Sequence, residues 1–328
     1  LNVFLLWYLN QPTGDEPPLC AYKAVCQDVS GMTEDEKFTY ISDLKEQADG
    51  LSLVEQVQSL YSQGSESGDS LAKQLKDNNS DIYKKYEEFY RTGDYLIYTD
   101  SLVKERILLD KLFEEISAVS GYEDYLASVQ ENSNQLGGIS IFQSSTSKET
   151  FGSRNIAKSA ADHAEMSSAD IRWFPSKGIT MAVESQATDL LLLLSVFLFV
   201  GQLIAEEKEK GLFAITRSTK RGLFADMGAR IVAILIHSGT VCLLLYGSNL
   251  IYASSMAGIG NLSVSLQSLA PYMESSFPIS LATFLALSLM TKIGVVFLLG
   301  LLLTACAVYS SHSFMPQLVG IGFLSLNW

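Results

Sequence analysis

The residues best suited to bind a metal or to attack a substrate are four cysteines and three histidines. His163, His237 and His312 are far apart in the sequence, and the chain has no Cys-x-x-Cys spacing, so no zinc site is predicted. The motifs GxSxG, HExxH and GxxxxGK(S/T) are also absent, so the sequence carries no signature of a serine hydrolase, a zinc protease or a P-loop nucleotide site. We therefore expect no catalytic residues, no metal and no bound cofactor in this chain.

Cys20 and Cys26 are a pair of cysteines that lie close together in a polar part of the sequence. They could close a small disulfide loop, because disulfides persist outside the cytoplasm. Two free thiols, in a protein from a reducing habitat, are an equally good interpretation. Cys242 and Cys306 lie in apolar runs, where we expect them to pack as small hydrophobic side chains.

Charge divides the sequence into two parts of different character. The net charge of the whole chain is -13. Residues 10–188 carry 30 acidic and 16 basic side chains, whereas residues 189–328 carry 6 acidic and 7 basic ones and are mostly apolar. A change this abrupt indicates a domain boundary, with the first part in water and the second in a membrane. We expect membrane lipids, and no nucleic acid, among the partners.

Four apolar runs in the second part are about as long as the 20 or so residues that a membrane-spanning helix needs. We predict spans at about residues 186–205, 231–253, 290–309 and 314–328. Residues 1–9 are interpreted as the end of an earlier span; the alternative is a leftover signal-peptide core, but no small-residue cleavage site follows them. The chain starts with Leu and stops inside an apolar run, so we expect a fragment truncated at both ends.

Basic residues predict which side of the membrane each part faces. Of the seven Lys and Arg residues after Asp189, six lie in residues 206–230, between two predicted spans. The positive-inside rule places this segment in the cytoplasm. Residues 10–185 then form an extracytoplasmic domain, residues 186–328 form the transmembrane domain, and the chain is a multi-pass protein of the cell membrane.

The extracytoplasmic domain is predicted to be mainly helical. Thr33 and Glu36 match a capping box, and apolar residues recur at steps of three and four as far as about residue 130. Heptads are not sustained, which favours a helix bundle over a long coiled coil. Ile139–Phe142 is a short strand candidate, and Trp173 is expected in a loop near the membrane surface. The predicted fold class is an all-α membrane protein: a transmembrane helix bundle with a mostly helical extracytoplasmic domain and minor β structure.

Few ionisable groups lie within the predicted spans. His237 lies near the inner third of its span and is expected to face a neighbouring helix. Lys292 lies at the outer edge of its span, where its long side chain can reach the membrane surface. A carrier driven by an ion gradient usually places ionisable groups in mid-membrane, so such a carrier is disfavoured.

The stretch EEKEKGLFAITRSTKRG, residues 206–222, resembles the segment that follows the second span in the membrane subunits of type-2 ABC exporters of Gram-positive bacteria. Those subunits carry a Glu-x-x-x-Gly pattern followed by Ser or Thr and then Arg. Here Glu207 and Gly211 match the first part, and residues 218–222 match the second. Arg230 stands where the family often has a Lys before the next span. Residues 261–292 also look like the amphipathic segment that precedes the family's fourth span.

The resemblance implies that residues 206–230 act as a coupling helix, which transmits ATP-driven movement from an ATPase to the spans. A glycine that can break a helix and a short apolar face both suit docking into a groove of a partner. A plain membrane-surface anchor is the alternative interpretation. The candidate coupling residues are Glu207, Gly211, Leu212, Phe213, Ile215, Arg217, Thr219 and Arg221.

The implied function is that of a transmembrane permease subunit of an ABC transporter, which exports a peptide, an antibiotic or a lipid-like substrate. Its partners would be a separate ABC ATPase subunit, which hydrolyses the ATP, and a second permease subunit in a homodimer or heterodimer. A different hypothesis is a membrane-anchored surface interaction or receptor protein, with the same spans and no transport activity.

Overall fold

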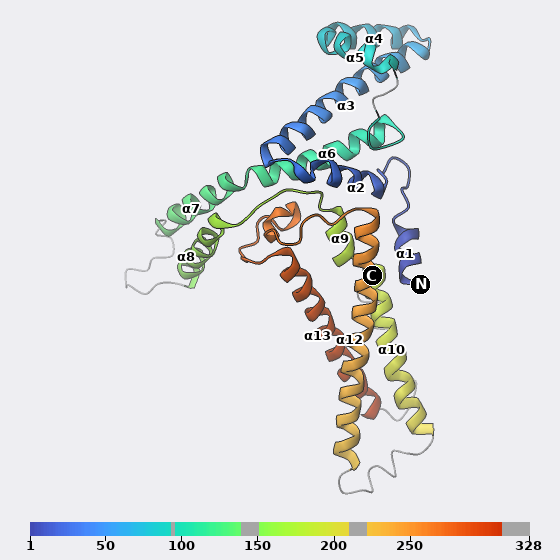
Figure 1. The fold of residues 1–328 in the computed structure, drawn as a ribbon, viewed down its shortest axis with the longest axis vertical. Helices are drawn as coiled ribbons and strands as arrows, with labels where there is room; N and C mark the ends of the chain where they lie inside the picture. The colour runs from blue at the N-terminus through green and yellow to red at the C-terminus, as the bar shows by residue number, and fades with distance from the viewer. Residues whose placement is uncertain (93–95, 139–150, 210–221, 310–328) are drawn as a thin grey trace. The chain divides into compact units, whose positions relative to one another are not determined.

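The computed structural model describes residues 1–92, 96–138, 151–209 and 222–309, and these are mostly helical (Figure 1). Within those ranges the β structure is limited to one antiparallel bridge, between Ser265 and Ser280. The predicted all-helical class is therefore confirmed for this part of the chain. The strand candidate Ile139–Phe142 lies outside the described residues.

The chain folds as two compact units, which we call the polar unit and the apolar unit. The polar unit comprises Gln11–Gly178 and Met256–Ala282. The apolar unit comprises Leu1–Asn10, Ile179–Ser255 and Thr283–Trp328. The polar unit thus contains a second segment, 256–282, which the charge pattern alone assigned to the transmembrane domain.

The polar unit is built from helices. In chain order its elements are α2 (Leu19–Asp28), η1 (Val29–Gly31), α3 (Glu34–Ser62), α4 (Glu66–Asn78), α5 (Ser80–Thr92), α6 (Leu102–Ser120), α7 (Tyr122–Gly138), α8 (Phe151–Ala164), η3 (Glu165–Ser168), η4 (Leu266–Ser268) and η5 (Ala270–Tyr272). The capping box that begins α3 is confirmed: the Glu36 N–H donates to Thr33 Oγ1 (3.4 Å), and the Thr33 N–H donates to Glu36 Oε2 (2.8 Å). The hydrogen bond from the Thr33 backbone lowers the pKa of Glu36.

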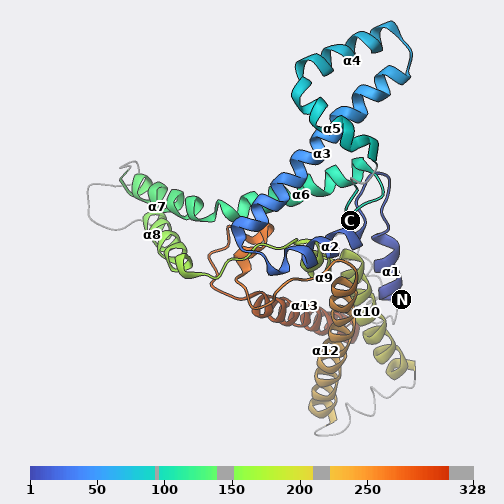
Figure 2. The same cartoon turned by 45° about the horizontal axis from the view of Figure 1, so that its top comes forward.

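The long helix α3 organises the polar unit, because other helices pack on both of its halves (Figures 1 and 2). α6 lies along it, and α4 and α5 pack against its C-terminal half. One apolar core forms around Ile41 of α3 and Leu112 of α6. A second core forms around Val54 of α3 together with Tyr83 and Tyr86 of α5. Helix-on-helix packing therefore supplies both cores.

Trp173 lies in a loop, as predicted, but its side chain belongs to the first of these cores and is not exposed as an aromatic group at a membrane surface would be. Its side chain is only 1% exposed and packs in the cluster that contains Ile41. The Trp173 N–H donates to Glu34 (2.8 Å), and the Trp173 carbonyl accepts a hydrogen bond from Lys37 Nζ (2.9 Å). Since these partners are 139 and 136 residues away in the sequence, no local pattern could have predicted them.

Hydrogen bonds attach the second segment of the polar unit to the first. The Ser265 N–H donates to the Asp170 carbonyl (3.1 Å), and the Arg172 N–H donates to Ser268 Oγ (3.1 Å). Within the segment, the buried amide of Gln267 donates to two backbone carbonyls. Buried polar groups satisfied in this way fix one conformation. The two segments form a single folded unit, although residues 179–255 separate them in the chain.

The apolar unit contains the long apolar helices. Its elements are α1 (Asn2–Leu9), the end of α9 (Lys177–Val183), α10 (Gln186–Glu209), α12 (Gly222–Met256) and α13 (Leu281–Tyr309). Three stretches are long and apolar enough to cross a membrane by length and composition: Lys177–Leu203, Phe224–Met256 and Leu281–Cys306. Gly300 of α13 faces Ile234 of α12 so closely that an added Cβ would lie 2.6 Å from the Ile234 side chain. The absence of a Cβ therefore allows these helices to pack tightly.

Two of the three helices begin earlier than the sequence predicted. α12 begins at Gly222, not near residue 231, and it takes in Arg230, which pairs with Asp226 one turn earlier (2.7 Å). α13 begins at Leu281, not near residue 290. Its first turns contain Thr and Ser, whose hydroxyls can bond to the preceding turn of the helix, so they do not interrupt it. The span predicted at 314–328 lies outside the described residues.

Glu105 of α6 holds the loop that precedes its own helix. Its side chain is only 2% exposed. It accepts hydrogen bonds from the backbone N–H groups of Ile97 (3.3 Å), Tyr98 (3.2 Å) and Thr99 (2.8 Å). The Thr99 hydroxyl also donates to it (2.8 Å). These bonds account for the non-helical path of residues 96–101, where the apolar repeat alone predicted a helix.

We predict that Glu105→Ala lowers the free energy of unfolding by roughly 2–4 kcal/mol, because several buried donors lose their acceptor. Urea unfolding of the purified full chain, followed by its helical circular dichroism, measures this change. Glu114→Ala, at an exposed position of the same helix, is the matched control and should change the free energy by no more than about 0.5 kcal/mol. Equal losses from the two substitutions would contradict the role given to Glu105.

Candidate functional site

The predicted coupling segment connects the ends of two membrane-length helices. Glu207 lies within α10, which ends at Glu209, and α12 begins at Gly222. The other candidate coupling residues lie outside the described residues: Gly211, Leu212, Phe213, Ile215, Arg217, Thr219 and Arg221. Their contacts therefore stay predictions, and the described site is the polar cluster between the helices themselves.

Cys20 and Cys26 are free thiols on one helix, α2. A helix rises about 1.5 Å per residue, so six residues separate the two backbones by about 9 Å. A disulfide requires Cα atoms within about 7 Å, so the two cannot be bridged while α2 is intact. Burial, together with the charge of Glu115, raises the pKa of the Cys26 thiol to about 11. Cys26 is therefore protonated and unreactive at neutral pH.

Three polar side chains from three helices meet in the apolar unit. Lys292 of α13 donates from Nζ to Asp189 Oδ1 of α10 (2.8 Å) and to the hydroxyl oxygen of Tyr246 of α12 (2.7 Å). The Tyr246 hydroxyl in turn donates to Asp189. Lys292 Nζ also lies 4.4 Å from the centre of the Tyr246 ring, within the range of a cation–π contact. We call Asp189, Tyr246 and Lys292 the polar triad.

The residues of the polar triad lie at different positions along the candidate spans, and Tyr246 is 22 residues after Phe224 and ten before Met256. Lys292 is eleven residues after Leu281 and fourteen before Cys306, the two ends of its span. Asp189 is twelve residues after Lys177 and fourteen before Leu203. The sequence predicted that the span begins near residue 290, and α13 begins nine residues earlier, at Leu281. A charged side chain inside a bilayer is costly, and hydrogen-bonded partners reduce that cost.

A second polar cluster lies next to the triad and includes α1. Asn2 of α1 donates to Asn249 Oδ1 of α12 (2.7 Å), and Thr188 of α10 donates to Asn2 Oδ1 (3.0 Å). Asn249 donates to Thr188 Oγ1 (2.9 Å), and all three side chains are buried. This cluster was not predicted from the sequence. The signal in the sequence was a few amide and hydroxyl side chains inside otherwise apolar runs. In a membrane, such side chains form hydrogen bonds with partners on neighbouring helices.

His237 faces a neighbouring helix, as the sequence predicted. Its Nε2 atom lies 3.1 Å from Ser195 Oγ of α10, and its ring stacks on Phe199 with centroids 4.1 Å apart. These contacts are with a hydroxyl and an apolar ring, so His237 joins α12 to α10.

A small cavity adjoins the triad. It has a volume of about 200 Å³, and its lining includes Tyr246, Gly247, Leu250, Leu289 and Lys292. Ligand pockets for drug-sized molecules are usually about 300–1,000 Å³. The cavity is too small for a peptide, so the geometry favours a role for the triad in joining helices. Within the described ranges, no group of three or more His, Cys, Asp or Glu side chains is arranged to hold a metal ion.

Comparisons of the chain with protein-family models, with curated proteins and with solved structures found no match.

We predict that the triad contributes through its charge pair. Asp189→Leu or Lys292→Leu alone leaves one charge without its partner. Because the Asp189 side chain is 43% exposed, each change should lower the stability of the chain in detergent by about 1 kcal/mol. The double variant removes both charges and should recover most of that loss. Thermal unfolding of the four proteins measures the coupling energy. Additive losses in the double variant would show that the two side chains do not act as a pair.

Proposed function

We propose that this chain is the membrane-spanning permease subunit of an ABC transporter of the type-2 exporter class. The observation that carries the proposal is the position of the segment resembling a coupling helix: it connects α10 to α12, two helices long enough to span a membrane. A separate ATPase subunit would dock on this segment, because the sequence has no nucleotide-binding motif of its own. A second permease subunit, the same or different, would complete the transporter.

Two independent arguments support the same topology. The positive-inside rule puts residues 206–230 in the cytoplasm, because they hold six of the seven basic residues after Asp189. The polar unit contains chain from before α10 and from after α12. If both helices span the membrane, these two stretches lie on the same side, opposite the connector. The polar unit is then extracytoplasmic and the connector faces the ATPase.

The polar triad fits this function as a mechanical link. It joins α10, α12 and α13 through a charge pair and a shared hydroxyl. Helices joined in this way move together, so a displacement of the connector reaches all three spans. The substrate class that suits the family is a peptide, an antibiotic or a lipid-like molecule.

A coupling role for the connector predicts that its substitution separates ATP hydrolysis from transport. Gly211→Pro replaces the glycine that is expected to break the helix, and Phe213→Asp places a charge on the short apolar face. Each substitution should therefore reduce the stimulation of the ATPase by the permease several-fold. The chain should still reach the membrane and still co-purify with its second permease subunit. ATP turnover by the reconstituted complex measures the effect, with Thr216→Ser as the control in the same segment. Unchanged turnover and assembly in both variants would contradict the coupling assignment.

The alternative is a membrane-anchored surface interaction or receptor protein without transport activity. Its support is that the polar unit has two apolar cores of its own and a sizeable cavity. The two functions differ in their genetic neighbourhood: a permease subunit needs an ATPase with a GxxxxGK(S/T) motif, and that gene usually lies beside the permease gene. A receptor protein needs none.

A further inference from the structure

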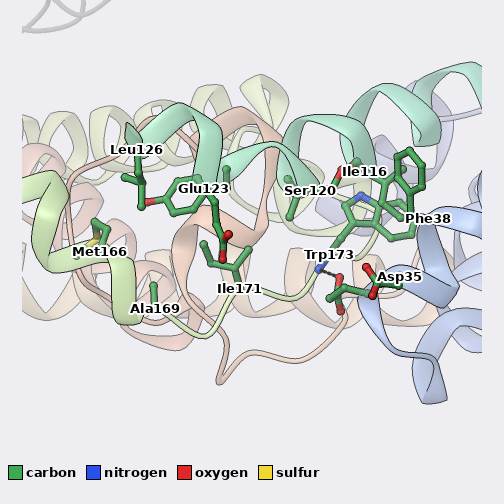
Figure 3. Close-up of a pocket in the computed structure, with 13 residues that line it drawn as sticks. Asp35, Phe38, Ile116, Ser120, Glu123, Leu126, Met166, Ala169, Ile171 and Trp173 are labelled. Carbon is green, nitrogen blue, oxygen red and sulfur yellow. Dashed lines mark hydrogen bonds between the residues drawn. The ribbon is translucent and has the colours of Figure 1, made fainter. Parts of the chain in front are cut away.

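The polar unit contains a cavity large enough for a ligand (Figure 3). It has a volume of about 580 Å³, within the usual range for ligand pockets. It lies between the first turn of α3, the end of α6, the start of α7 and residues 166–173. Its apolar and aromatic lining includes Phe38, Ile116, Leu126, Ile171 and Trp173.

The charged residues that line this cavity are all acidic. They are Glu34, Asp35 and Glu123, and the lining contains no Lys or Arg. Glu34 is already engaged, because it accepts hydrogen bonds from Lys37 Nζ (2.6 Å) and from the Trp173 N–H. The carboxylates of Asp35 and Glu123 have neither a hydrogen bond nor an ion pair with any described residue. Both residues are exposed, so their two negative charges are accessible to a ligand at the edge of the cavity.

Two polar groups buried in the cavity wall also have no partner. Trp173 and Tyr122 are 1% and 4% exposed, and neither the indole Nε1 nor the Tyr122 hydroxyl has a hydrogen-bond partner among the described residues. Buried groups without partners are uncommon in folded proteins and cost about 1–3 kcal/mol each. The backbone of Trp173 is fixed by Glu34 and Lys37, and its ring lies beside Phe38 and Ile116 in Figure 3. The hydrogen bonds of its backbone thus hold Trp173 in place in the aromatic wall.

We propose that this cavity binds a basic side chain of an amphipathic peptide, with the neighbouring apolar residues of the peptide on the aromatic wall. Carboxylates attract an ammonium or guanidinium group, and aromatic faces stabilise the same cations. An anionic lipid or a phosphate would be repelled by the acidic lining. The proposal deepens the proposed function, because it names the class of substrate that would be exported. Only the step from binding to export rests on the proposed function, since the binding itself needs no ATPase.

The test measures peptide binding to the full chain alone, in nanodiscs of neutral phosphatidylcholine, by fluorescence anisotropy. The probe is a short labelled amphipathic peptide with Lys and Trp residues, compared with peptides in which every Lys is replaced by Gln or by Glu. The cavity variant is Asp35→Asn with Glu123→Gln. The matched control is Asp69→Asn with Glu66→Gln, which removes two exposed acidic residues from the first turn of α4. Both variants lose the same formal charge.

The Lys peptide should bind the wild-type chain, and the cavity variant should bind it about tenfold more weakly, as expected for the loss of charge-assisted contacts. The control should change affinity less than about twofold, and Phe38→Ala should weaken binding with all charges retained. No binding, equal binding of the Gln peptide, or equal losses in the cavity variant and the control would overturn the proposal. Because no ATPase is present, failure here is distinct from failure of the coupling test.

Discussion

The connectivity of the polar unit constrains the rest of the structure. Its two stretches of chain precede α10 and follow α12, and they are joined by hydrogen bonds such as those of Ser265 with Asp170 and of Arg172 with Ser268. A folded polar unit occupies one side of a membrane. α10 and α12 must therefore cross the membrane together or not at all, and their length and apolar composition favour crossing. In the proposed topology, the basic connector between them lies on the opposite side, where the positive-inside rule also places it.

Within the candidate spans, apolar packing and a few polar contacts have different roles. The apolar cluster around Val196, Ile234 and Val296 brings three helices into contact, but apolar packing alone does not fix their register in lipid. The triad adds directional contacts, because Asp189, Tyr246 and Lys292 come from three different helices. The Asn2–Thr188–Asn249 cluster adds contacts with α1. Polar contacts thus add specificity to the arrangement that apolar burial stabilises.

Local features of the sequence were predictable, and long-range ones were not. The capping box at Thr33 and the apolar character of the three long helices follow from residues close together in the chain. The start of α13 was misplaced because Leu281–Thr291 resembled the family's amphipathic external segment. The partner of Lys292 lies 103 residues away, and those of Trp173 lie farther still. The acidic cavity is assembled from three separate stretches of chain, so neither its volume nor its acidic lining could be predicted from spacing.

The most direct test of the proposed topology is labelling of single cysteines with a membrane-impermeant maleimide in intact cells, after replacement of the native cysteines. Ser67→Cys reports the first stretch of the polar unit, Ser263→Cys reports the second, and Ser218→Cys reports the connector. The topology predicts that the first two react in intact cells and that the third reacts only after permeabilisation. Labelling of Ser67→Cys and Ser263→Cys from opposite sides, or labelling of Ser218→Cys from outside, would contradict it.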